Sequence, residues 1–213
     1  MRSLLTCLAL AACGGRIPTT RYYQLAAPAA AVPASSTGTV LAVEPLVADG
    51  AYDDERIIYR LDPVRLDYYE YHRWSSAPGA MIGSYLEAAL ARTGEFQVVA
   101  RDPTDATAVV LGGRVTALEE IDVDARHWVG HVALELTLRD AKTGATLWAR
   151  TYNRSEPEVT QSPEGLARAL GVAMDRIVRA ATPEIVELAN HQAQVRGLTP
   201  PPVAAEDGHS SSR

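Results

Sequence analysis

Hydrophobic positions in the first half of the chain predict short strands on both sides of one helix. β-branched and apolar residues gather between turn signals, a pattern typical of strands, over residues 39–47, 56–61, 64–71 and 96–100. Ser76 and Pro78 favour the start of a helix, and Gly94 favours its end. Apolar residues recur between them at helical spacing, which predicts a buried face made of Met81, Ile82, Tyr85, Leu86, Ala89 and Leu90.

The clearest pattern covers residues 128–139, where apolar and polar side chains alternate. One parity holds Trp128, Val132, Leu134, Leu136 and Leu138, and the other holds His131, Glu135, Thr137 and Arg139. Such alternation predicts an antiparallel strand with one buried face. Residues 108–121 are its expected partner, and the turn at 140–144 predicts a hairpin to a strand over 145–152.

A longer helix is predicted to begin at Ser162 and Pro163 and to run to about Val195. Pro183 is expected to kink or divide this helix, because its ring removes a backbone donor and crowds the preceding turn. The order of elements predicts the α+β class: a mostly antiparallel sheet with two main helices packed on one face, an α/β sandwich.

The first residues of the chain have the pattern of a bacterial lipoprotein signal. Arg2 precedes a short apolar run, and residues 10–13 read Leu-Ala-Ala-Cys, which is similar to the lipobox of bacterial lipoproteins. We therefore expect cleavage of residues 1–12 and acylation of Cys13 with chains such as palmitate. The alternative is an ordinary secretory signal with an incidental cysteine. The signal is shorter than the usual ~15–30 residues, which leaves open whether the true start codon lies upstream of Met1.

The remaining chain is predicted to contain one folded domain between two segments without periodicity. Residues 13–37 are expected to hold the lipidated cysteine and a flexible tether rich in alanine and proline. Residues 38–196 are expected to form the α/β domain, and residues 197–213 a disordered tail.

The composition limits what this domain can bind and how it is stabilised. The formal net charge is −6, which argues against nucleic acid and against a polybasic membrane-binding surface. Cleavage before Cys13 leaves that residue as the last cysteine, so an internal disulfide is excluded and burial must stabilise the fold. After the signal no stretch approaches the ~20 apolar residues of a membrane helix.

The sequence offers no catalytic or cofactor-binding constellation, so we expect a protein that is not an enzyme and has no cofactor and no metal. Gly112 and Gly113 lie inside a predicted strand without a following lysine, which indicates a bulge or a close backbone contact. A hydrolase is the least favoured class, since no recognisable nucleophile turn surrounds Ser84, Ser155 or Ser162.

Two groups of polar residues invite a metal interpretation, and a simpler one is preferred for each. His127 and His131 share one strand face near Asp122, Asp124 and Glu135, but no third histidine or cysteine completes a ligand set. A solvent-facing polar row explains them. Residues 53–55 read Asp-Asp-Glu and lack the spacing of a calcium loop, so a solvated turn is expected.

Aromatic residues are concentrated in residues 68–74, which read Tyr-Tyr-Glu-Tyr-His-Arg-Trp. One interpretation is a core and sheet-edge cluster, with the odd-numbered rings inward and Tyr68 and Trp74 capping the next helix. The other is a contact surface for protein or lipid. The candidate interface consists of Tyr59, Tyr69, Tyr71 and Trp74.

Several of these segments together resemble the ABC-type transport auxiliary lipoproteins, the family of the paraquat-inducible lipoprotein PqiC. The similarity covers about residues 22–185, and its most specific part is the tyrosine-to-tryptophan string that precedes a helix. The segments that carry it are residues 22–25, 40–46, 56–60, 68–74 and 80–91, in addition to the lipobox.

The resemblance implies a lipoprotein on the periplasmic face of the outer membrane that accompanies an MCE-type lipid transport system. Its partners would be an MCE-domain periplasmic protein with its permease and ATPase, and the cargo phospholipid or another lipid. The implied role is docking, as a homo-oligomeric ring of subunits. The family supplies no catalytic residue, and beyond Cys13 no binding residue is transferred.

Two other functions stay open at this point. A lipid-anchored domain of this kind can serve as a scaffold or regulator of another envelope machine, in secretion or cell-wall synthesis. It can also carry lipid itself, which requires a cavity between sheet and helices that composition does not reveal.

Overall fold

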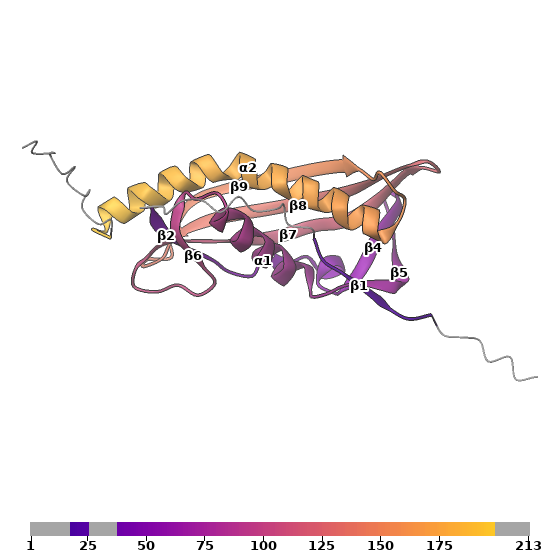
Figure 1. The fold of residues 1–213 in the computed structure, drawn as a ribbon, viewed down its shortest axis with the longest axis horizontal. Coiled ribbons are helices and arrows are strands. Elements are labelled where there is room, and N and C mark those ends of the chain that lie inside the picture. Colours follow the sequence, from indigo (N-terminus) through magenta and orange to yellow (C-terminus); the bar gives the residue numbers. More distant parts are fainter. Residues whose placement is uncertain (1–17, 26–37, 199–213) are drawn as a thin grey trace, which may run out of the picture.

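Strand β7 (Thr107–Asp124) is the central element of the structure, because four of the other described strands pair with it directly and the remaining four pair with one another or with these. The computed structural model describes residues 18–25 and 38–198 (Figure 1). The other elements are β1 (Arg21–Tyr23), β2 (Thr39–Val43), β3 (Val47–Ala48), the short 3-10 helix η1 (Gly50–Tyr52), β4 (Arg56–Asp62), β5 (Arg65–Trp74), α1 (Pro78–Ala91), β6 (Phe96–Ala100), β8 (His127–Asp140), β9 (Thr146–Pro157) and α2 (Pro163–Val195).

The two edges of β7 have different partners. Along one edge it pairs with the antiparallel strand β8, which pairs in turn with β9. Along the other edge it pairs successively with the parallel strands β2, β3 and β4. Strand β6 extends the sheet beyond β2, and β5 and β1 extend it beyond β4. The sheet is therefore mixed, its longest ladders are antiparallel, and the predicted α+β class is confirmed.

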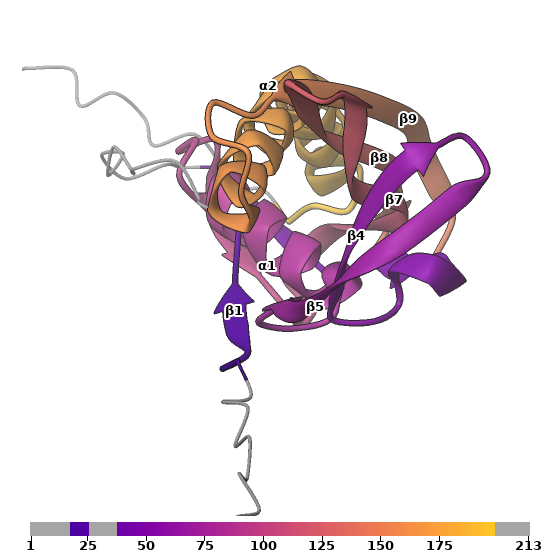
Figure 2. The same cartoon turned by 90° about the vertical axis from the view of Figure 1, so that its right-hand side faces the viewer.

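Both helices lie on the same side of the sheet, as Figure 1 and the end view in Figure 2 show. Helix α2 runs along the length of the sheet (Figure 1). Its 33 residues span about 50 Å, which is close to the ~60 Å of the 18-residue strand β7. It buries Leu166, Leu170 and Ile177 completely in the core. Ser162 caps its start by accepting a hydrogen bond from the Gly165 N–H at 3.1 Å, as the sequence predicts.

The structure differs from the predicted elements at two prolines, Pro45 and Pro183. Residues 39–47 do not form one strand, because Pro45 has no N–H and the Leu46 N–H donates to the Gly79 carbonyl of α1 at 3.1 Å. Helix α2 runs through Pro183 without being divided. Ala181 and Ile185, on either side of the proline, are both buried in the core and hold the two parts of the helix in place.

The folded part of the chain begins earlier than residue 38. Strand β1 falls in the segment predicted as tether, yet it pairs in parallel with the end of β5, and the following Leu25 is buried. Residues 26–37 and the predicted tail beyond Leu198 lie outside the described residues. None of the helices that are described is long and apolar enough to cross a membrane.

Gly113 lies at a close backbone contact between β7 and β8, one of the two interpretations of the glycine pair. Its φ is +151°, and a Cβ at this position would overlap the carbonyl oxygen of Glu135. The irregularities in the β7–β8 register lie elsewhere, near Ala117 and near Asp124. Any side chain here must push the two longest strands apart.

We expect Gly113→Ala to lower the free energy of unfolding by about 2 kcal/mol or more, because the added methyl collides with backbone rather than with a flexible side chain. Chemical denaturation followed by tryptophan fluorescence measures the change. Gly50→Ala is the matched control, since a Cβ there meets nothing within 4 Å. Equal stability of the two variants would show that β7 and β8 adjust without cost.

Candidate functional site

The aromatic cluster joins three strands through consecutive ring contacts. The Tyr59 and Tyr69 centroids lie 5.1 Å apart, and Tyr69 meets His72 edge-on at 5.7 Å. His72 in turn lies 5.6 Å from Tyr23. The contacts connect β4 and β5 to the short strand β1. These rings therefore pack against one another and stabilise contacts between strands of the same chain.

Tyr23 continues the cluster to helix α2. Its hydroxyl lies 2.7 Å from Nδ1 of His72 and donates to Oε1 of Glu164 at 3.1 Å. Its carbonyl accepts a hydrogen bond from the Ser75 N–H at 2.7 Å. Glu164 lies in the first turn of α2, so Tyr23 fixes β1 to the sheet and to the start of the helix.

The four residues of the candidate interface differ in exposure. Trp74 is fully buried and belongs to the core, which removes it from any exposed surface of this chain. Tyr59, Tyr69 and Tyr71 are half-buried. Tyr69 points inward as the parity predicts, whereas Tyr68 is exposed and lies 3.9 Å beneath the Arg56 guanidinium. The ring contacts described above do not include Tyr71, so it is the half-buried member best placed to meet a partner.

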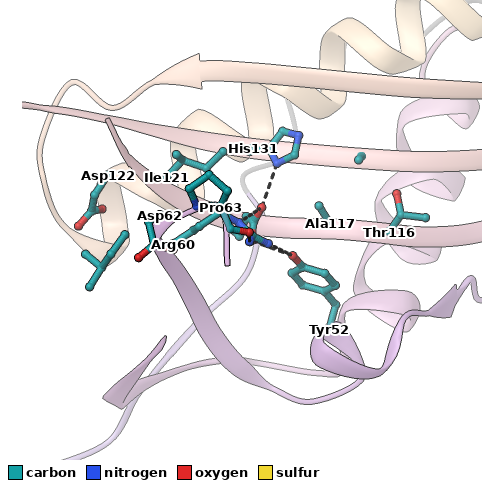
Figure 3. A pocket seen from close by; sticks show the side chains of 12 residues that line it. Tyr52, Arg60, Asp62, Pro63, Thr116, Ala117, Ile121, Asp122 and His131 are labelled. Atoms are coloured by element: carbon teal, nitrogen blue, oxygen red, sulfur yellow. Dashed lines mark hydrogen bonds and ion pairs between the residues drawn. The ribbon is translucent and has the colours of Figure 1, made fainter. Parts of the chain in front are cut away.

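A buried ionic network lies on the sheet face away from the helices (Figure 3). The Glu119 carboxylate accepts hydrogen bonds from the Tyr52 hydroxyl at 2.7 Å and from Nη2 of Arg60 at 3.0 Å. Nδ1 of His131 lies 3.2 Å from the same carboxylate, and its Nε2 lies 3.1 Å from Oδ1 of Asn153. Burial alone would raise the pKa of Glu119, but its hydrogen bonds with His131, Arg60 and Tyr52 outweigh burial and lower it.

This network forms one wall of a cavity of about 650 Å³. Apolar side chains, among them Leu61, Pro63 and Ile121, form much of the remaining lining. Burial, followed by the hydrogen bond to Glu119, raises the pKa of Tyr52 to about 12, so this hydroxyl is a hydrogen-bond donor at neutral pH. The Glu119 carboxylate is engaged by Arg60, Tyr52 and His131. The apolar part of the lining is suited to binding an apolar group.

The neighbouring Glu120 lies on the opposite face of β7, beneath the start of α2. It pairs with Gly130, whose Cβ position meets Ala169 of that helix. The Tyr69 hydroxyl donates to Oε1 of Glu120 at 2.8 Å. Burial, together with the nearby carboxylates of Glu158 and Asp122, raises the pKa of Glu120 to about 9.

A proton on Glu120 accounts for several carboxylate oxygens that lack hydrogen bonds. Oε2 of Glu120, Oδ1 of Asp122 and both side-chain oxygens of Glu158 are buried without a partner among the described residues. Two ionised carboxylates repel each other, whereas a neutral carboxyl can donate to an ionised one. Burial also raises the pKa of Glu158. The raised pKa values of Glu120 and Glu158 favour a neutral carboxyl between β7 and the loop before α2.

The two histidines considered for metal binding do not come together. His127 contacts Asp124, with 2.7 Å between Nδ1 and Oδ2, while His131 is engaged by the Glu119 network. His131 is largely buried and is not part of a solvent-facing row. Among residues 18–25 and 38–198, no group of three His, Cys, Asp or Glu side chains could hold a metal ion. Asp54 of the acidic run 53–55 instead binds Arg56 at 2.9 Å.

Cys13 lies outside the described residues, so its acylation stays a prediction. The sequence analysis did not predict that the pKa of Glu119 is lowered while that of Glu120 is raised. A signal for it was present, because two adjacent glutamates interrupt the apolar run of residues 115–121 in a strand expected to be buried.

Comparison with known proteins gives a consistent result. Residues 23–181 match the family described as ABC-type transport auxiliary lipoprotein component. The crystal structure of protein XCC0632 from Xanthomonas campestris, of the family DUF330, is similar with a TM-score of 0.65 at 18% identity, over 84% of this chain and 100% of that one. The crystal structure of an uncharacterized protein has a TM-score of 0.64 at 18% identity, over 79% and 99%. At these identities the structures show the shared fold. No curated protein matches the chain significantly.

Glu119→Gln is expected to lower the free energy of unfolding at pH 7 by about 3 kcal/mol, because it leaves the Arg60 guanidinium without its buried counter-charge. Since the pKa of Glu119 is lowered in the folded state, the wild type loses this stabilisation as pH falls through that pKa. Denaturant titrations of both chains at pH 7 and in acid measure the difference. A gap that is equally large in acid would contradict the ionised pair.

Glu120→Gln is expected to behave in the opposite way. The folded chain binds a proton at Glu120 more tightly than the unfolded chain, so wild-type stability falls as pH rises from 4.5 towards about 9. The amide mimics the neutral carboxyl and removes this dependence, so the variant gains on the wild type by up to about 1.4 kcal/mol per pH unit. Stability measured across this range for both chains is the test, and parallel profiles would refute a protonated Glu120.

Proposed function

Because this chain belongs to the family of ABC-type transport auxiliary lipoprotein components, we propose that it is the lipid-anchored accessory of an MCE-type lipid transport system at the outer membrane. The family match over residues 23–181 carries the proposal. The Leu-Ala-Ala-Cys sequence at residues 10–13 supports the anchor. The role is to dock the periplasmic MCE protein, with its permease and ATPase, near the membrane that receives or supplies lipid.

The anchor is acylated Cys13. Several acyl chains on one cysteine hold a protein firmly, at about 0.8 kcal/mol per buried methylene, whereas one chain is marginal. Gly14 follows the cysteine, and it is not the aspartate that retains enteric lipoproteins at the inner membrane. Residues 1–12 form the signal, and the periplasm-facing domain extends to about residue 196.

Docking uses the parts of the sheet that the helices leave uncovered. The face with the Glu119 network carries the apolar cavity of about 650 Å³, which is suited to an apolar side chain or acyl group. Strands β6 and β9 are edge strands, as is the short β1, and among the described residues each pairs on one edge only, so β6 and β9 offer hydrogen-bonding edges for a ring of subunits. Tyr71 lies on β5 beside Tyr59 and Tyr69 as a further contact point.

In intact cells, the full-length protein with a photo-crosslinking amino acid at Tyr71 is expected to capture the MCE protein or a second copy of itself. The same amino acid at Val172, which is 47% exposed on α2, is the matched control, because it lies on a helix and not on the uncovered part of the sheet. Mass spectrometry identifies the captured chains. Secretion or cell-wall components in place of the MCE protein and its permease would leave the fold intact and overturn the function.

Cys13→Ser is expected to abolish the incorporation of labelled palmitate and to move the protein from the outer-membrane fraction to the soluble periplasm, because no acyl chain then holds it. Labelling and membrane fractionation give the two readouts. Cys7→Ser is the control, since Cys7 belongs to the expected signal and leaves with it. Palmitate incorporation that persists in Cys13→Ser would place the anchor elsewhere.

A further inference from the structure

Three turns lie side by side at one end of the molecule, and we call this the hairpin end. They are the β4–β5 turn, the β7–β8 turn and the loop between β9 and α2. Arg60 of β4 is paired with Ile121 of β7, which brings the first two turns together. The Glu158 N–H donates to the Trp128 carbonyl at 2.9 Å, which brings the third turn to the second.

The hairpin end presents apolar side chains to solvent. Val159 and Val64 have relative exposures of 101% and 93%, the highest of the exposed large hydrophobic residues, and Val123 is 62% exposed. Single exposed valines are ordinary, but Val64 and Val159 in two of the turns and Val123 at the end of β7, beside the third, form a local concentration.

In two of these turns an aspartate side chain accepts hydrogen bonds from the backbone of the same turn. Asp62 accepts hydrogen bonds from the N–H groups of Val64 and Arg65, both at 2.9 Å. Asp124 accepts from the N–H groups of Arg126 and His127, at 2.8 and 3.0 Å. The turns therefore satisfy their own backbone donors while their valines point outward, an arrangement that tolerates contact with an apolar phase.

The N-terminal strand joins the domain at the same end. Arg21 lies 3.9 Å from Glu164, and the Tyr23 hydroxyl donates to it at 3.1 Å. Glu164 directly follows the β9–α2 loop. Figure 1 shows β1 and the start of α2 at the right-hand end, and the end of α2 at the left.

The distance from the anchor to this end is short. Cys13 precedes Pro18, the first described residue, by five positions, and a fully extended chain covers about 18 Å over that length. Because β1 is fixed to β5 and α2, residues 26–37 add nothing to this distance. A lipid on Cys13 therefore keeps the hairpin end within reach of the bilayer.

We propose that the hairpin end rests on the membrane, with Val64, Val123 and Val159 in the lipid interface and the long axis of the domain directed away from it. The proposal rests on the lipid anchor of the proposed function. The end of α2 and the β2–β6 edge then face the periplasm, about 60 Å away along β7. The contact is apolar rather than basic, because the arginines near the two turns are accompanied by aspartates. Asp62 and Asp124 accept hydrogen bonds from the backbone N–H groups of Arg65 and Arg126, and the Arg65 guanidinium lies 3.5 Å from Asp67.

The test uses the full-length acylated protein reconstituted in vesicles of phosphatidylethanolamine and phosphatidylglycerol. Single cysteines for an environment-sensitive fluorophore replace Val64, Val123 or Val159. Val98 and Val195, exposed by 47% and 67% at the opposite end, provide matched controls. The mature chain has no other free thiol once Cys13 is acylated, so each label has one position. Nitroxide-labelled lipids report which positions reach the bilayer.

We expect nitroxide lipids to quench the labels at the hairpin end by about half or more and to leave those at Val98 and Val195 unchanged, since interfacial groups lie ~5–10 Å deep. Equal quenching at both ends, or at neither, overturns the proposal. Shielding of the three positions that requires the MCE protein and not lipid also overturns it, in favour of a protein contact. Palmitate labelling separates the two failures: without label the anchor is wrong, and with label but without quenching only the orientation is wrong.

Discussion

The hydrogen bonding of β7 along both of its edges is the constraint on which the rest of the structure depends. One edge is paired with β8 over nearly its whole length, and the other receives β2, β3 and β4 in succession. A side chain at Gly113 would overlap the backbone of β8 at Glu135. Since α2 is nearly as long as β7, the helix runs along most of the length of the sheet.

The alternation of side chains along β7 separates two adjacent glutamates into different environments. Glu119 faces Arg60, Tyr52 and His131 and is held ionised on the face that carries the cavity. Glu120 faces the start of α2 and other carboxylates, and burial favours its neutral form. Strand β7 thus places the ionised Glu119 on the face proposed for docking and the neutral Glu120 on the face that packs against the helix. An unpaired charge on that second face would be costly.

The aromatic cluster has a structural role, because it positions strand β1, in addition to any role in binding. Its rings connect β4 and β5 to β1, and Tyr23 joins β1 to Glu164 of α2. This connection determines where the chain leaves the domain on its way to Cys13. In the proposed anchored state a short leader leaves less freedom of orientation than a long tether, so a domain with β1 docked presents a defined end to the membrane.

Local sequence patterns were sufficient for the elements whose information lies within a few residues. Periodicity located both helices and the β7–β9 meander, Ser162 and Pro163 marked the start of the second helix, and the α+β class followed from the order of elements. The parallel pairing of β2, β3 and β4 with β7, the docking of β1 and the burial of Trp74 join segments far apart in the chain, and no local period encodes such partners. The charge states of Glu119 and Glu120 were decided only by tertiary structure for the same reason, because the side chains that surround each of them come from distant strands and from the loop before α2.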